Sequence, residues 1–337
     1  MEKEITTYSM WNLFRNCRRA CFWRYEKHLV PVGADDRPLR FGTVIHEALR
    51  IWHTGRDLGA VLAYIDRAFA NRSSDPELKQ DWHYATAMMK GYTGRYPVEE
   101  WEGGPTEVTF QCGIENPMSR GLSRTFRLAG KVDGLIQKRD GTQHIIEHKT
   151  ASVIGGDYVE RLWTDLQITL YTHLVRRSGA LVNGVLYNVL VKPKLVQARG
   201  ESEEEFQARS AELAARNKSG KSSAQRRMPE SDEEFQARLA TWYSEPDRFV
   251  RVELLIDDDA IRNVRYELWE LTQQLLIARR RYAWYQNTSY CFHYGRPCPY
   301  WPICASKDNP VVIQSQYLER PPHTELNPTG DTVDPVF

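Results

Sequence analysis

A carboxylate, a histidine and a lysine stand together at the end of an apolar stretch of the chain. In the segment IIEHKTAS (145–152), two isoleucines lead directly into Glu147, His148 and Lys149. Side chains alternate between the two faces of a strand, so Glu147 and Lys149 are predicted to point the same way. Two interpretations fit: an ion pair where a strand leaves the core, or an active site in which Glu147 binds a metal ion and Lys149 lies beside the bond that is broken.

Asp133 is predicted to face Glu147 across a β-hairpin. The Asp-Gly pair at 140–141, between two strand-like runs, is typical of a hairpin turn. A two-residue loop would place Asp133 opposite His148. A three-residue loop over 139–141, with its glycine left-handed, instead places Asp133 opposite Glu147 and on the same face. We predict the second register, because glycine is favoured in a left-handed conformation.

Two carboxylates beside a lysine suit a divalent cation. Asp133 and Glu147 would repel each other, and a hard cation relieves that repulsion. Magnesium prefers oxygen ligands and binds through one or two carboxylates together with substrate phosphate. Such an ion polarises a phosphate and lowers the pKa of an attacking water molecule, and Lys149 could orient that water or stabilise the developing negative charge. Taken alone, Asp133 is equally well explained as a strand-end carboxylate near a turn.

The pattern as a whole resembles the signature of the PD-(D/E)XK nucleases. The resemblance is carried by GKVDG (130–134) and by the Glu-His-Lys triplet, whose glutamate follows fourteen residues after Asp133. FGTVIHEAL (41–49) and QITLYTHL (167–174) resemble the G-x-x-x-H and Q-x-x-x-Y elements of the RecB-like branch of this superfamily. These pieces occur in the family order, and the resemblance covers roughly residues 5–305, apart from 197–246.

The resemblance implies a role for each matching residue. The expected catalytic residues are Asp133, Glu147 and Lys149, and the expected ligands of Mg²⁺ or Mn²⁺ are His46, Asp133, Glu147 and the backbone carbonyl of His148. Gln167 and Tyr171, four residues apart on one helix face, would line the site and touch DNA. Without the family, His46 is explained as a half-buried helix histidine, and Gln167 with Tyr171 as an ordinary helix surface.

Four of the six cysteines resemble an iron–sulfur ligand set. Three lie in CFHYGRPCPYWPIC (291–304), and Cys17 could complete a four-coordinate site from the other end of the chain. Cys17, Cys291, Cys298 and Cys304 match the iron–sulfur branch of RecB-like nucleases, which includes the AddB nuclease domain and the CRISPR adaptation nucleases. In that branch a 4Fe–4S cluster pins the N-terminal helix to the C-terminal segment, which would constrain the unfolded chain.

The cysteine pattern leaves alternatives open. The first two C-terminal cysteines are usually closer together in the branch than six intervening residues, and Cys21 lies one helical turn from Cys17. We favour Cys17 because Ser9, Phe14 and Cys17 match the start of the family motif. Cys112 alternates with apolar residues and is predicted to be a small core residue. Disulfides are disfavoured by the predicted cytoplasmic location, which rests on the absence of a signal-peptide pattern near the N-terminus.

The order of predicted elements indicates an α/β protein. The resemblance implies a restriction-endonuclease-like mixed sheet flanked by helices and wrapped by helical terminal segments that are joined at an iron–sulfur cluster. We divide the chain into a helical segment carrying Cys17 and His46 (1–100), a nuclease core (101–196), a polar helical insertion (197–246), a core strand with a long helix and the cysteine-rich segment (247–305), and a disordered tail (306–337). The insertion contains a short duplication, ESEEEFQAR (201–209) and ESDEEFQAR (230–238).

Composition constrains the partners only weakly. Lysines and arginines minus acids give 45 − 44 = +1, a balance that neither indicates nor excludes nucleic-acid binding. Arginines mixed with aromatic residues near the start and at 279–285 suit stacking on a single strand, although solvated helix faces explain them equally well. The sequence has no run of eighteen apolar residues, so a membrane partner is not expected.

The sequence therefore predicts a Mg²⁺- or Mn²⁺-dependent deoxyribonuclease. The resemblance implies an exonuclease that prefers single-stranded DNA ends, with 5′ to 3′ polarity favoured, in recombination, repair or phage DNA metabolism, possessing a 4Fe–4S cluster and working with a recombination or replication protein. The alternatives are a structure-specific endonuclease of the same superfamily, a non-catalytic single-strand DNA-binding iron–sulfur subunit, and an unrelated protein stapled by zinc.

Overall fold

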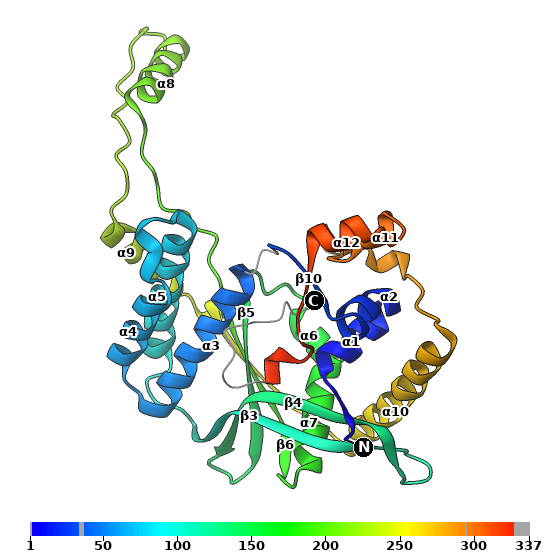
Figure 1. Cartoon of the computed structure of the whole chain (residues 1–337). Helices are drawn as coiled ribbons and strands as arrows, with labels where there is room; N and C mark the ends of the chain where they lie inside the picture. The colour runs from blue at the N-terminus through cyan, green and yellow to red at the C-terminus, as the bar shows by residue number, and fades with distance from the viewer. Residues whose placement is uncertain (1, 34–36, 294, 327–337) are drawn as a thin grey trace.

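A six-stranded mixed sheet forms the centre of the molecule (Figure 1). The computed structural model describes residues 2–33, 37–293 and 295–326. The strands of the sheet are β1 (Glu4–Thr6), β3 (Trp101–Glu115), β4 (Leu122–Lys138), β5 (Gln143–Ala151), β6 (Val182–Val191) and β7 (Phe249–Leu255). Strand β4 pairs with antiparallel β3 along one edge. Along its other edge it pairs first with β1, which runs parallel, and then with β5, which runs antiparallel. Strand β6 runs parallel to β5 and antiparallel to β7.

The parallel pair β5–β6 requires a crossover connection, which two helices supply. These are α6 (Tyr158–Leu162) and α7 (Leu166–Arg177). The Asp165 side chain caps α7 by accepting the N–H of Gln167 at 2.8 Å. Helix α7 packs against β3, β4 and β6, and its apolar face covers the sheet core around Val132, Ile145 and Val189.

A second helical layer has its own apolar core. It consists of α3 (Arg37–Gly55), α4 (Leu58–Ala68), the 3-10 turn η2 (Ala70–Ser73), α5 (Pro76–Arg95) and α9 (Asp232–Tyr243). Phe41, Leu49, Met88, Tyr92 and Phe235 are among its buried residues. Helix α3 also contacts β3 and β5, so this layer brings residues 37–55 to the strands that follow it in the sequence.

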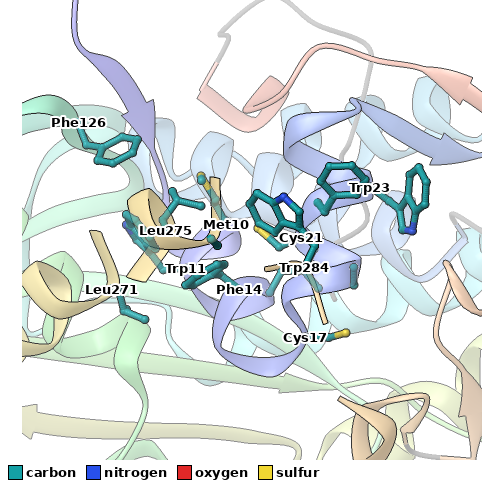
Figure 2. Close-up of a cluster of buried hydrophobic side chains, with 14 of the residues drawn as sticks. Met10, Trp11, Phe14, Cys17, Cys21, Trp23, Phe126, Leu271, Leu275 and Trp284 are labelled. Atoms are coloured by element: carbon teal, nitrogen blue, oxygen red, sulfur yellow. The ribbon is translucent and has the colours of Figure 1, made fainter. Parts of the chain in front are cut away.

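The two ends of the chain pack together around aromatic residues (Figure 2). The N-terminal part comprises α1 (Tyr8–Asn16), α2 (Arg18–Cys21), the π-helical turn η1 (Phe22–Glu26) and β2 (Leu29–Pro31). The long helix α10 (Asp258–Arg281) and Trp284 complete the cluster, with Trp284 5.2 Å from the Phe22 ring and 6.5 Å from the Phe14 ring. Helices α1 and α2 are separated at Cys17, whose backbone is extended (φ −157°, ψ 111°).

The polar insertion forms a long arm that projects from the helical layer (Figure 1). Its end is α8 (Glu203–Arg216), which buries none of its residues. Helix α9 starts with the second copy of the duplicated sequence and buries Phe235, Leu239 and Tyr243. Both helices begin with the same capping box, at Ser202 and at Ser231. The 3-10 turn η3 (Pro246–Arg248) then leads into β7.

The C-terminal segment returns to the N-terminal one. It contains η4 (Thr288–Tyr290), β8 (Phe292–His293), β9 (Arg296–Pro297), α11 (Trp301–Ala305), α12 (Pro310–Gln316), β10 (Tyr317–Glu319) and η5 (Thr324–Leu326). Strand β10 pairs with β2, so residues 306–326, for which the sequence predicts disorder, are ordered instead. The remainder of that predicted tail, 327–337, lies outside the described residues. Within the described part of the chain, every helix is too short or too polar to cross a bilayer.

Candidate metal centre

The hairpin between β4 and β5 has the register predicted from its three-residue loop. Gly141 has a φ of +85°, which is the expected left-handed conformation. Regular pairing runs from the turn to Gly134 opposite Ile146. Asp133 and Glu147 therefore occupy facing positions directly beyond the last pair.

The Asp133 carboxylate links helix α3 to strand β5. Its Oδ1 atom lies 3.2 Å from Nδ1 of His46, and its Oδ2 atom accepts a 2.7 Å hydrogen bond from the backbone N–H of His148. Burial alone would raise the pKa of Asp133, but the His46 imidazole outweighs burial and lowers it. The same pairing raises the pKa of His46 against the effect of its own burial. Asp133 is thus held as an anion and oriented from two sides.

Glu147 belongs to a separate hydrogen-bonded group. Its Oε1 atom accepts from Nζ of Lys149 at 2.8 Å and from Nε2 of Gln167 at 2.9 Å. Burial raises the pKa of Glu147 to about 7, although the Lys149 ammonium opposes the shift. The carboxylate in turn keeps the pKa of Lys149 well above its ordinary value, despite burial. A cation close to Glu147 would stabilise its charged form.

The predicted residues of α7 lie where that helix meets the sheet. Gln167 contacts the Glu147 carboxylate, as described above, and Tyr171 lies one turn further along. The Tyr171 ring covers Gly130, where a Cβ atom would come within 3.0 Å of the ring. Its edge contacts Tyr8, with the ring centroids 6.3 Å apart. The glycine of the GKVDG segment therefore lets α7 approach β4 closely.

A polar network from the neighbouring strands β6 and β7 holds the side chain of His148. Asn188, which pairs with His148 across β5 and β6, places its Nδ2 atom 2.9 Å from Nδ1 of the histidine. Arg251 on β7 reaches the Asn188 oxygen at 3.4 Å, the Tyr92 hydroxyl at 2.8 Å and both Glu99 carboxylate oxygens at 2.7 and 2.9 Å. Burial lowers the pKa of His148 to about 3, so the ring is neutral and accepts the amide hydrogen bond. The network fixes the residue whose N–H orients Asp133.

Glu107 on β3 is a member of this site that sequence reasoning missed. Single ligand atoms of His46, Glu107 and Asp133 all lie within 4.8 Å of one another, and no other histidine, cysteine or carboxylate trio among the described residues is as close. Glu107 also forms an ion pair with Lys131. The sequence predicts a strand near 108–114, whereas β3 begins at Trp101 and has an irregularity between Gly103 and Thr106. The spacing of acidic residues along the sequence gave no sign of this position.

A cavity of about 240 Å³ opens onto these residues. His46, Glu107, Asp133 and His148 line it, together with side chains from the end of α3 and from β3. Arg50 and Arg56 are among the lining residues, and they are paired with Glu47 and Glu99 respectively. The cavity therefore offers carboxylates, imidazole and guanidinium groups to a hydrated ion or a phosphate.

Two arginines of the segments near the start and at 279–285 lie inside the fold or in ion pairs. Arg24 is buried. Arg279 donates to the carboxylates of Glu26 and Glu4, which ties α10 to the N-terminal segment. Arg18 remains at the surface side of a cavity of about 540 Å³, with its guanidinium 5.0 Å from the Phe14 ring centroid and 4.9 Å from the Tyr285 ring centroid.

The four cysteines at the chain ends line one small cavity. Cys17, Cys291, Cys298 and Cys304 share its wall with residues including Tyr290 and Tyr300. All six cysteines are free thiols, and among the described residues no three of these sulfurs lie within 4.8 Å of one another. Burial raises the pKa of the Cys298 thiol to about 11.

The two remaining cysteines lie elsewhere. Cys21 is fully buried in the aromatic cluster and does not line the cavity of the other four thiols (Figure 2). Cys112 is partly buried on β3, where burial raises the pKa of its thiol to about 11. Both thiols pack in or against the aromatic cluster that also contains Cys17, but neither lines the cavity of the other four.

Comparison with known proteins identifies the class. The profile of the PD-(D/E)XK nuclease superfamily matches residues 6–305, and the chain therefore belongs to that superfamily. Its mixed sheet flanked by helices is consistent with a restriction-endonuclease-like fold. The crystal structure of SSO0001 aligns with 80% of this chain and 78% of its own, with 12% sequence identity and a TM-score of 0.31. No curated protein gives a significant match.

Membership defines the general chemistry. Nucleases of this superfamily depend on divalent metal ions and act on DNA. The trio of His46, Glu107 and Asp133 offers a candidate acidic metal site in this chain. One imidazole and two carboxylates, the donors gathered there, suit a magnesium- or manganese-sized cation.

Proposed function

We propose that this protein is an exonuclease of the RecB-like iron–sulfur branch that degrades DNA from single-stranded ends. One observation carries the catalytic part of the proposal: Asp133 and Glu147 take facing positions at the open end of the β4–β5 hairpin, with His46 beside Asp133 and Lys149 paired with Glu147. A pure binding protein has no use for a buried carboxylate paired with a half-buried lysine next to an imidazole and a second carboxylate.

His46, Asp133, Glu147 and the backbone carbonyl of His148 are the proposed ligands of Mg²⁺ or Mn²⁺. When bound, the ion supplies Lewis acidity towards the scissile phosphate and towards the attacking water. Lys149 contributes a fixed positive charge beside Glu147, where negative charge develops on the phosphate. Gln167 holds the Glu147 carboxylate in place through its 2.9 Å hydrogen bond. Tyr171, one helical turn further along, is proposed to lie beside the bound DNA strand.

The four cysteines are proposed to hold a 4Fe–4S cluster. They line one cavity, they come from both ends of the chain, and none of them is in a disulfide. Four thiols around one cavity match the number of ligands that a 4Fe–4S cluster takes. The cluster would fasten the N-terminal helices to the cysteine-rich segment.

Single-stranded DNA is the substrate that the surface near that junction suits. Arg18 lies against Phe14 and Tyr285 at a cavity of about 540 Å³, and arginine beside exposed tyrosine is a common platform for unpaired bases. A polarity of 5′ to 3′ and a role in recombination, repair or phage DNA metabolism, with a recombination or replication partner, complete the proposal and follow from the family branch.

A cleavage assay on anaerobically purified protein tests this function. The substrates are single- and double-stranded DNA labelled at either end and circular single-stranded DNA, each with Mn²⁺ or Mg²⁺. We expect mononucleotides or short products from linear single strands, with release beginning at the 5′ end, and an intact circle. Cutting of the circle or of branched duplexes would favour an endonuclease, and DNA binding without cleavage would favour the binding subunit. Iron and sulfide analysis with visible absorbance tests the cluster separately.

A further inference from the structure

A separate cavity lies where strands β5 and β6 end. The two strands run parallel and pair Ala151 with Val191, so both end at the same edge of the sheet. The cavity has a volume of about 440 Å³ and is lined by residues 152–154, by the segment that follows β6, and by Trp242 of α9. A strand rises about 3.3 Å per residue, so residue 152 lies roughly 10 Å beyond Lys149. The cavity is therefore within a few nucleotides' reach of the proposed catalytic residues.

Hydrogen bonds from two helices hold one wall of this cavity in place. The hydroxyl of Tyr243 in α9 donates to the carbonyl of Val191 at 3.1 Å. The hydroxyl of Tyr84 in α5 donates to the carbonyl of Leu195. Trp242, the residue before Tyr243, lines the cavity from α9. The polar insertion, which contains α9, thus supplies part of a wall that is fixed before any ligand binds.

The charged groups that line the cavity are mostly cations. Positive charge comes from Lys192, Lys194 and Arg248, and Asp247 is the one carboxylate among the lining residues that the structure describes. Lys192 is already paired with Asp81, at 3.0 Å. Arg248 is paired with Asp247, at 2.6 Å. Lys194 is exposed, and it has no carboxylate partner in the part of the chain that the structure covers, so its charge is available to an anion.

Trp242 adds an aromatic surface beside these charges. Its ring is half-buried, and the Arg248 guanidinium lies 4.3 Å from the ring centroid. The exposed side chain of Val153 extends the apolar part of the lining. A groove that combines positive charge with an aromatic ring suits single-stranded nucleic acid, because cations attract the phosphates and bases stack on the ring. An acidic peptide would use the lysine but would leave the aromatic surface without a role.

We propose that this cavity binds the nucleotides of single-stranded DNA next to the scissile phosphate. Lys194 contacts a backbone phosphate, and a base stacks on the Trp242–Arg248 pair. The polar insertion then has a role in substrate binding, because α9 carries the tryptophan and the segment that leads into the insertion carries the lysine. The inference rests on the proposed function, since it names a subsite for the same substrate.

The salt dependence of DNA binding by the full-length protein tests this subsite. Fluorescence anisotropy of a labelled single strand of about 16 nucleotides, with EDTA present to prevent cleavage, gives the affinity at each salt concentration. Lys194→Gln should reduce the slope of log affinity against log salt concentration by about 0.7, the contribution of one phosphate contact on a single strand. Trp242→Leu should weaken binding about 5- to 150-fold and leave that slope unchanged, because a stacked base is lost without a charge.

Lys218→Gln is the matched control, because Lys218 is an exposed lysine on the projecting arm. This variant should keep the wild-type affinity and slope. An unchanged slope for Lys194→Gln, or an equal reduction for Lys218→Gln, overturns the subsite, and continued DNA cleavage by the wild type then leaves the nuclease proposal intact. A wild type that binds no single strand and cleaves no DNA overturns both.

Two further measurements complete the test. If thermal melting shows that Trp242→Leu is unfolded, Lys194→Gln carries the test alone, because its side chain is exposed and unpaired. A labelled polyglutamate peptide serves as the competing ligand. Loss of peptide binding in Lys194→Gln, together with wild-type affinity and slope for DNA, would assign the cavity to an acidic protein partner and overturn the proposal.

Discussion

The carboxylate site and the cysteine site both gather residues from distant parts of the chain, but the fold holds them in different ways. Around Asp133 and Glu147, hydrogen bonds from His148, Lys149 and Gln167 fix the carboxylates in the absence of any ion. The cysteine sulfurs have few polar partners, such as the Asn287 N–H, which is 3.5 Å from Sγ of Cys17. The first site is assembled by a sheet, whereas the second lies between short elements that meet at the chain ends.

The two sites are also stabilised by different parts of the fold. The strands that carry the carboxylates are paired on both sides, so their positions follow from the register. The cysteine-rich segment contains only two-residue strands, a three-residue turn and the five-residue helix α11. Elements this short are marginal by themselves. We therefore expect loss of the metal ion to stop catalysis with little unfolding, and loss of the thiol-bound group to loosen the chain ends.

The largest effect is expected for Cys17→Ser. Serine is a poor iron ligand, so the variant should lose its iron and the cross-link between the chain ends. A cross-link that closes a loop of a hundred residues or more contributes about 4–5 kcal/mol in the chain-entropy treatment, and we expect a loss of that order in the free energy of unfolding. Thermal melting with iron analysis measures both quantities. Full iron content together with an unchanged melting temperature would contradict the proposed ligand set.

Lys149→Ala should have the opposite effect: a loss of catalysis without a loss of iron. Removing the charge beside Glu147 is expected to slow DNA cleavage by about 10²–10³-fold, the range for loss of one transition-state-stabilising group. The iron content should stay at the wild-type level, because Lys149 is remote from the cysteine cavity. Lys138→Ala is the matched control: this lysine ends the same hairpin and pairs with Glu253. Equal cleavage by wild type and Lys149→Ala would point to a contaminant or to a different site.

Asn188→Leu tests whether the network behind His148 orients the metal site. The substitution keeps the size of the side chain and removes its hydrogen bond to the imidazole. Loss of such an outer-layer contact typically lowers metal affinity by about 10–100-fold. The buried Tyr92 and the partly buried Arg251 also lose a partner, at about 1–3 kcal/mol of stability. Mn²⁺ titration at a temperature where the variant is folded separates the two effects.

The same substitution at Asn183, an exposed residue of the same strand, supplies the control. Asn183→Leu should keep the wild-type Mn²⁺ affinity. If Asn188→Leu lowers stability while leaving the affinity for Mn²⁺ unchanged, the network has a structural role only. The carboxylates would then not be oriented through His148 and Asn188.

Much of the metal site could be predicted because short-range rules determine it. The left-handed glycine at 141 set the hairpin register, and the register set Asp133 against Glu147. The helical repeat placed Gln167 and Tyr171 on one face, and the family resemblance assigned that face to the site; in the structure Gln167 contacts Glu147.

Glu107 and the His148 network could not be predicted because they depend on long-range pairing. The position of Glu107 follows from an irregularity in β3, and the Asn188–Arg251 contact follows from the order of β5, β6 and β7. The duplicated sequence shows the same limit. Its second copy buries Phe235 in the helical layer, while the equivalent Phe206 lies on the projecting arm, so identical local residues have different surroundings.

The smallest effect, and the sharpest test of which thiols form a group, is expected for Cys21→Ala. Cys21 is fully buried among aromatic residues one helical turn from Cys17, and it lies away from the cavity that the other four cysteines line. Removing its sulfur should cost about 1 kcal/mol, as a small loss of packing does, and should leave the iron content unchanged. Iron loss equal to that of Cys17→Ser would show that Cys21 is a ligand. The aromatic cluster would then have to open to admit the bound group, and the chain ends would owe their packing to that group rather than to their own apolar contacts.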